Sequence, residues 1–163
     1  MLAPANKSRP EEIPKVVSPT GGKQMGLVYA EIELISVDDI VLSRHGFLQE
    51  DKIKRLTVNA LVDTGAYMLV ISDQIRQQLG LPLIEEQMFR MADDTERRGE
   101  VVGPVEVRFE NRRASVDAVV LPGALEVLLG SIPLEDLDVT IDPRQQRLIV
   151  NPKSPDIATK HLK

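Results

Sequence analysis

The sequence predicts an all-β, closed or barrel-like domain with one or two short helices. Apolar residues make up 42% of the 163-residue chain and aromatic residues only 3%, so the core has to be built from Val, Leu and Ile, which favour strands. Short apolar segments recur along the chain, and several alternate with polar residues as half-buried strands do. Turn-forming residues separate them. Many short strands joined by turns are typical of closed β architectures.

The composition predicts one domain flanked by two tails. Residues 1–24 contain four prolines, at positions 4, 10, 14 and 19, and cannot bury much apolar surface, so they predict a disordered leader. Residues 25–152 carry the alternating segments and form the predicted domain. Residues 153–163 predict a flexible basic tail.

Two strands and a polar connection are predicted before Asp63. The segment Tyr29–Ile35 alternates between apolar and polar residues and predicts the first strand. Asp38 and Asp39 begin a connection, which continues as a polar loop over residues 43–51. Residues 53–62 predict the strand that delivers Asp63.

A short helix and a hairpin are predicted further along. Ser72 suits the N-cap of a helix and Gly80 its C′ position, which predicts a helix between them. Residues 83–91 predict a strand. The polar residues 92–98 predict the tip of a hairpin, with solvated arginines at positions 97 and 98.

The remaining predicted elements are all short. Alternating residues 105–109 and the apolar residues 114–121 predict a second hairpin, with Arg112 and Arg113 solvated in its turn. Four further elements are predicted: a buried strand over 126–129, a helix that begins near Pro133 and runs through Leu137, and strands over 139–141 and 147–150.

The segment from Ala60 to Ala66 contains the most informative motif. An apolar run delivers Asp63 into a tight turn formed by Thr64 and Gly65. A carboxylate at the inner end of a buried strand is costly unless it is hydrogen-bonded, paired or protonated. Asp-Thr-Gly alone is also an ordinary turn sequence. Apolar flanks on both sides, however, predict a buried turn that holds the carboxyl group rigidly.

The chain resembles the retropepsin-like, or retroviral-type, aspartic proteases, and in particular their bacterial single-domain members. The residues Leu61–Ala66 match the apolar-apolar-Asp-Thr-Gly-Ala motif of that family, and Leu128, Leu129 and Gly130 match its later apolar-apolar-Gly motif. The resemblance covers residues 26–152. It implies the closed retropepsin (acid protease) fold with Asp63 as the catalytic residue.

The resemblance also implies roles for the residues around Asp63. Thr64 hydrogen-bonds across a dimer interface, Gly65 allows close approach of the partner chain, and Ala66 lines the floor near the substrate. The flap residues are Met91, Ala92 and Asp93, although this chain has Asp94 where a flexible glycine is expected. The family motif residues Leu128, Leu129 and Gly130 pack beneath the Asp63 loop. The residues 148–150 form a dimer strand, or else an ordinary edge strand of one subunit.

Hydrolysis by carboxylates requires two of them, because one accepts a proton from water while the other donates one to the carbonyl group. The chain carries one Asp-Thr-Gly motif, so the second carboxyl has to come from a second copy. We therefore expect an aspartic endopeptidase that acts as a C2 homodimer on an extended peptide, with no cofactor. The alternative is a non-catalytic dimerisation or peptide-binding module of the same fold.

Other functions are disfavoured by the composition. The net charge of −5 argues against a nucleic-acid partner, and the lack of cysteine excludes disulfides and thiolate metal sites. His45 and His161 lie in a predicted loop and tail, so no metal site is expected. The sequence has no apolar stretch of membrane-spanning length and no signal-peptide core, which predicts a cytoplasmic protein without a membrane partner.

Overall fold

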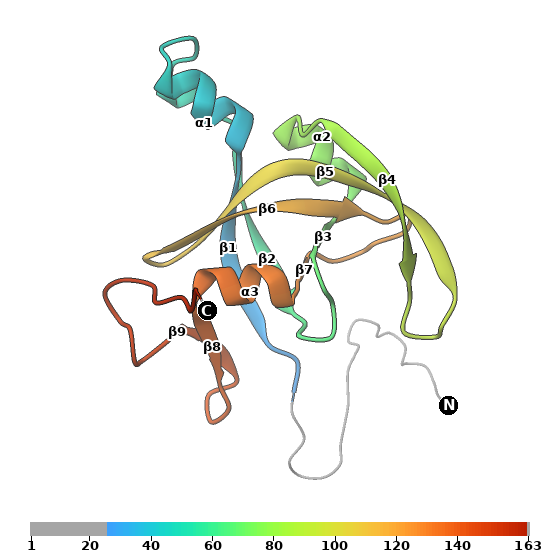
Figure 1. The fold of residues 1–163 in the computed structure, drawn as a ribbon, viewed down its shortest axis with the longest axis vertical. Coiled ribbons are helices and arrows are strands. Elements are labelled where there is room, and N and C mark those ends of the chain that lie inside the picture. The colour runs from blue at the N-terminus through green and yellow to red at the C-terminus, as the bar shows by residue number, and fades with distance from the viewer. Residues whose placement is uncertain (1–25, 163) are drawn as a thin grey trace, which may run out of the picture.

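The structure, a computed structural model, describes residues 26–162, so the predicted leader lies outside the described residues. A strongly curved sheet dominates it, with helix α3 beneath the sheet and a small hairpin to one side (Figure 1). The strands are β1 Tyr29–Ser36, β2 Arg55–Val62, β3 Leu69–Ile71, β4 Leu83–Arg90, β5 Glu96–Phe109, β6 Arg112–Val120, β7 Leu128–Leu129, β8 Val139–Asp142 and β9 Arg147–Val150. The helices are α1 Val37–Arg44, α2 Asp73–Leu79, α3 Ser131–Leu137 and the 3-10 helix η3 Glu50–Lys52.

The strand pairings of the large sheet form a closed circuit. Strand β1 pairs with β2 on one side and β5 on the other, and the circuit continues through β7, β3 and β6 back to β5. Strand β4 extends the sheet beyond β5, while β8 and β9 form a separate two-stranded sheet. The prediction of an all-β fold is confirmed.

The core consists of aliphatic side chains, together with Phe109, that line the inside of this circuit. The inward positions of β1 alternate with exposed ones near its start, as the sequence pattern predicted. Completely buried side chains include Leu34 from β1, Leu69 and Ile71 from β3, and Leu129 from β7. Because β3 and β7 are buried, the segments on either side of the Asp63 loop are anchored in the core.

The helix α2 lies where the sequence predicted it, with the expected caps. Ser72 Oγ accepts a hydrogen bond of 3.2 Å from the amide of Ile75, and Gly80 adopts a left-handed φ of 64°. The helix α3 begins two residues before Pro133 and ends at Leu137, also in agreement with the prediction.

The helix α1 replaces part of the predicted polar connection, so that prediction is wrong. The described residues therefore contain three α-helices rather than one or two. Figure 1 shows α1 projecting from the sheet. The buried Asp39 attaches α1 to the chain before β2: it accepts a hydrogen bond from the amide of Lys54 at 2.9 Å and forms an ion pair with the Lys54 ammonium group at 2.9 Å. Burial raises the pKa of Asp39, but the bonds and charge of Lys54 outweigh that effect and lower the pKa overall.

Residues 151–162, which we call the C-terminal strap, fold back onto the domain. Asp138 accepts hydrogen bonds from Ser154 Oγ at 2.6 Å and from the amide of Thr159 at 2.9 Å. Arg112, predicted to be solvated, has a side chain only 1% exposed and donates to the Ser154 carbonyl. Residues 153–162, predicted as a flexible basic tail, thus supply hydrogen-bond partners to polar groups of the domain.

Within the described residues, no helix is long and apolar enough to cross a membrane.

Candidate active site

Asp63 lies at the carboxyl end of β2, directly beside β7. These two strands are parallel, with Leu61 opposite Leu128 and Val62 opposite Leu129. The register continues one step beyond β2, since the amide of Asp63 donates to the carbonyl of Leu129 at 3.0 Å. The aspartate backbone is thus fixed by a ladder bond to a buried strand, and only its side chain and the following turn leave the sheet.

The turn after Asp63 holds the carboxylate in one orientation. The amide of Gly65 donates to Asp63 Oδ1 at 3.0 Å, and the amide of Ala66 donates to the Asp63 carbonyl at 3.1 Å. Asp63 is half-buried while Thr64 and Gly65 are exposed, so the carboxyl group is rigid but accessible.

Gly130 supports the Asp63 loop from below. A Cβ atom at this position would lie 2.4 Å from the carbonyl oxygen of Met68 and 2.8 Å from that of Ala66, so only glycine allows the loop to come this close. The amides of Ser131 and Ile132 donate to the carbonyls of Ala66 and Tyr67 at 2.9 and 3.0 Å. The start of α3 thereby satisfies the loop's carbonyls.

The structure thus brings the two sequence motifs together, although about 60 residues separate them along the chain. Leu129 and Gly130 touch the Asp63 loop through backbone contacts, and Leu128 pairs with both Leu61 and Val70. Thr64 has no side-chain hydrogen bond within residues 26–162 and is exposed.

The predicted flap is a hairpin made of β4 and the first part of β5. The tip is shorter than predicted, because β5 already begins at Glu96, and residues 97 and 98 lie in a strand. The amide of Met91 donates to the Thr95 carbonyl at 2.8 Å to close the turn. Asp94 takes a left-handed φ of 67°, the conformation glycine favours, and aspartate tolerates it.

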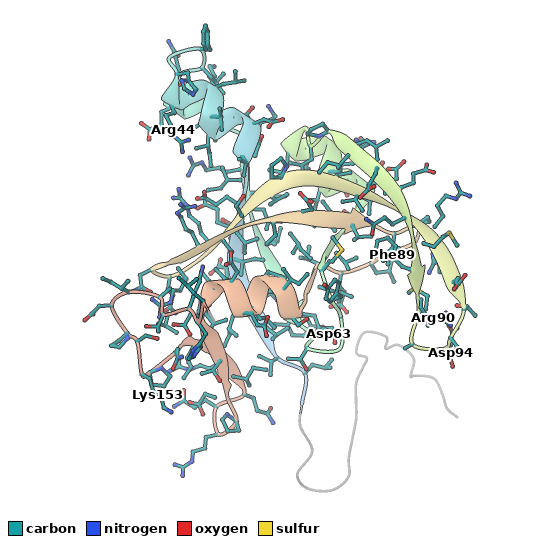
Figure 2. The ribbon with its side chains drawn as sticks, in the orientation of Figure 1. Arg44, Asp63, Phe89, Arg90, Asp94 and Lys153 are labelled. Carbon is teal, nitrogen blue, oxygen red and sulfur yellow. The ribbon has the colours of Figure 1, made fainter. Side chains whose placement is uncertain are left out.

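Asp93 stiffens the flap tip. Its Oδ1 accepts from the Thr95 hydroxyl at 2.6 Å and from the Thr95 amide at 3.0 Å, and these bonds lower the pKa of Asp93. Ala92 lies between Asp93 and Met91 in the same exposed turn. Figure 2 shows the flap tip at Asp94 and the Asp63 loop on the same side of the curved sheet. Within residues 26–162 no hydrogen bond joins the flap tip to the Asp63 loop, and each turn is held by its own bonds.

Some contacts around the site had no signal in the sequence. The Tyr29 hydroxyl donates to Glu126 Oε1 at 2.7 Å, which together with burial and the charge of Glu126 raises the pKa of Tyr29. Arg97, expected to be solvated, donates to the carbonyl of Pro122. Both contacts join segments far apart in the chain, so no local pattern predicts them.

The described residues contain no group of three or more His, Asp or Glu side chains placed to hold a metal ion. The Asp63 carboxyl group itself has the Gly65 amide as its backbone donor.

A family model described as "gag-polyprotein putative aspartyl protease" matches residues 50–136. The match spans more than half of the chain and includes the Asp63 loop, the flap and Gly130. The protein belongs to this family of retropepsin-like aspartic proteases, and the predicted all-β fold of the family is confirmed. A search of curated proteins found no match.

Proposed function

We propose that the protein is an aspartic endopeptidase that acts as a homodimer, with Asp63 of each copy forming the catalytic pair. The observation that carries this proposal is the rigid, accessible Asp63 carboxyl group, held by Gly65 and supported by Gly130, with one such motif in the chain. Membership of an aspartyl protease family supports it.

The chemistry follows from the pairing of two carboxyl groups. At about 3 Å two carboxyls cannot both ionise, so they share one proton and titrate as a coupled pair. The ionised Asp63 accepts a proton from water as the water attacks the peptide carbonyl. The protonated Asp63 donates its proton to the carbonyl oxygen, and the tetrahedral intermediate then collapses with protonation of the leaving amine.

The β8–β9 hairpin supports dimer formation. A two-stranded sheet is only marginally stable on its own, and its edges invite pairing. Within residues 26–162 neither β8 nor β9 has a further strand partner. Ile149 and Val150 on β9 are half-buried, which leaves apolar surface for a second copy to cover. A two-fold axis between the copies places the same surface of each copy against the other, as a pair of Asp63 residues from two copies requires.

The substrate is proposed to be an extended peptide between the Asp63 loop and the flap. The exposed residues near the site include Tyr67, which is 71% exposed, and Leu125, which is 95% exposed. Such large apolar side chains on a surface commonly mark a contact area for a partner. The flap residues Met91, Ala92 and Asp93 are proposed as contacts from the other side.

The test is cleavage of an unfolded polypeptide at mildly acidic and neutral pH. Asp63→Asn removes the proton-transferring group, and general acid–base catalysis contributes about 10²–10⁴-fold, so cleavage should fall at least that far. Asp51→Asn is the matched control, because Asp51 is exposed in η3, which precedes β2, whereas Asp63 follows the other end of that strand. It should keep wild-type activity.

Two further observations complete the test. Specific activity should rise with protein concentration in the range where the dimer forms, because one chain supplies only half of the site. An intact polypeptide with both the wild type and Asp63→Asn, under conditions where the protein is dimeric, would refute the protease. That result would favour the non-catalytic binding module.

A further inference from the structure

The loop between β6 and β7, residues 121–127, is attached at both ends to other elements. At its start, Arg97 of the flap donates to the Pro122 carbonyl. At its end, Tyr29 of β1 donates to Glu126 at 2.7 Å, and the Val127 carbonyl accepts from the Leu61 amide at 2.8 Å. We call this segment the β6–β7 loop; in Figure 1 it leaves β6 beside the flap and returns to β7 at the centre of the sheet.

This loop leads directly into the catalytic centre. It continues into β7, whose Leu129 carbonyl accepts from the amide of Asp63. Between its two attachments the loop exposes Leu125 almost completely. A change in the position of the loop therefore moves the exposed side chain of Leu125 relative to β7, the strand that holds Asp63.

A second contact joins the loop to the flap at Gly99 in β5. A Cβ atom on Gly99 would lie 2.9 Å from the ring of Phe89 and 3.0 Å from Cδ2 of Leu121, so both side chains occupy the space a larger residue would take. Figure 2 shows Phe89 on the flap arm, near the point where the arm leaves the body of the sheet. Arg97 and Gly99 thus connect the same arm to the same loop.

The other flap arginines make their ion pairs inside the flap. Arg90 pairs with Glu96 at 3.2 Å, and Arg98 pairs with Glu86 at 2.9 Å. Among the described residues, Arg97 is the flap arginine whose hydrogen bond reaches another element. Arg97 and Arg98 are neighbours on one strand with the same chemistry, which makes Arg98 a matched comparison.

We propose that Arg97 is a positioning residue that couples the flap to the β6–β7 loop, so that closure of the flap on a peptide also sets the position of the cleft wall beside Asp63. A strand and a loop that share a charge-assisted bond and a packed contact move together rather than independently. The consequence for substrate binding rests on the proposed protease function, whereas the coupling itself does not.

The coupling is tested first by hydrogen exchange on the full-length protein, which requires no activity. Arg97→Ala should accelerate amide exchange in residues 121–127 by about tenfold, the factor that corresponds to the loss of one charge-assisted hydrogen bond. Arg98→Ala should leave that exchange unchanged. Arg97→Lys keeps a charged donor and should restore part of the protection.

Two exchange results would overturn the coupling. One is unchanged exchange in residues 121–127 in Arg97→Ala. The other is an equal increase in Arg98→Ala, which would show that any loss of charge on the flap has the same effect. Circular dichroism of each variant confirms that the fold is retained, and Gly99→Ala provides a second variant that disturbs the same junction through Phe89 and Leu121.

The consequence for substrate is tested by kinetics on a peptide that the wild type cleaves. Arg97→Ala should raise KM about tenfold with kcat within about twofold of wild type, because the residue positions the cleft and does not touch the reacting atoms. A loss in kcat with unchanged KM would overturn the positioning role. Absence of cleavage by the wild type would count against the protease function alone, since the exchange measurement still decides the coupling.

Discussion

Replacing Gly130 by alanine is the most direct test of how the Asp63 loop is supported. The added Cβ would lie 2.4 Å from the Met68 carbonyl oxygen, 2.8 Å from that of Ala66 and 2.9 Å from the Met68 amide nitrogen. All three are backbone atoms, so no side-chain rotation relieves the clash. Ordinary contacts begin at 3.4 Å, so the loop has to move by about 1 Å.

A movement of this size has a calculable cost. Overpacking of a closely packed site costs about 1–3 kcal/mol. The bond from the Ser131 amide to the Ala66 carbonyl, now 2.9 Å, would lengthen beyond hydrogen-bonding range, and each such bond contributes about 1 kcal/mol. Gly130→Ala should therefore lower the free energy of unfolding by about 2–4 kcal/mol, a large part of the 5–15 kcal/mol typical of a domain.

The assay is urea unfolding followed by circular dichroism at one fixed protein concentration, because the proposed dimer would make stability depend on concentration. With an m-value of about 1.5 kcal/mol/M, a loss of 3 kcal/mol moves the midpoint by about 2 M urea. Gly65→Ala is the control, since a Cβ there meets only Asp63 Oδ1, at 3.3 Å. That variant should lose less than about 1 kcal/mol.

The result that would refute this reasoning is a Gly130→Ala protein whose stability lies within about 0.5 kcal/mol of wild type. It would mean that the Asp63 loop does not lie against Gly130. Loss of stability to the same extent in Gly65→Ala would also refute it, because the effect would then not depend on the support beneath the loop.

Two further predictions concern the C-terminal strap. The hydrogen bonds from Ser154, Thr159 and Asn151, with the charge of Arg112, lower the pKa of Asp138 from 3.8 to about 2. The ionised Asp138 therefore stabilises the fold fully above pH 3.8, and this stabilisation is lost as the pH falls towards 2. Asparagine tolerates the left-handed φ of 55° at this position, so Asp138→Asn should not strain the backbone. The variant should be less stable than wild type at neutral pH, and its stability should change less between pH 3.8 and 2, as measured by unfolding at a series of pH values. An unchanged acid profile would contradict the role of Asp138. Arg112→Ala removes the buried side chain that donates to the Ser154 carbonyl and pairs with Asp138, and it should lower the free energy of unfolding. It should also expose the strap to trypsin at Lys153, whereas Arg113→Ala, at an exposed neighbour, should leave the strap resistant.

Local patterns determined the elements that line the candidate site. Alternation along β1 and the second hairpin, and the caps of α2, are properties of neighbouring residues, so they are visible in the sequence. The Asp-Thr-Gly-Ala and Leu-Leu-Gly segments were visible for the same reason. The family match then agrees with the fold that these motifs implied.

The helix α1 shows where such patterns fail. Its apolar residues Ile40, Val41 and Leu42 are consecutive and mostly exposed, so no helical period marks it. What stabilises α1 is the N-cap at Ser36 and the contact of Asp39 with Lys54, fifteen residues further along the chain. A contact at that distance forms only once β1 and β2 have paired.

The sequence by itself therefore determined the fold class and the turn that holds Asp63, because these depend on residues next to one another. Only the tertiary structure decided which distant groups meet: Gly130 beneath the Asp63 loop, Arg97 with Pro122, Tyr29 with Glu126, and Arg112 beneath the strap. The physical reason is that the partner of a buried or charged group can be far away in the sequence and lies beside it only in the folded chain. The same arginine is solvated or buried according to what folds over it.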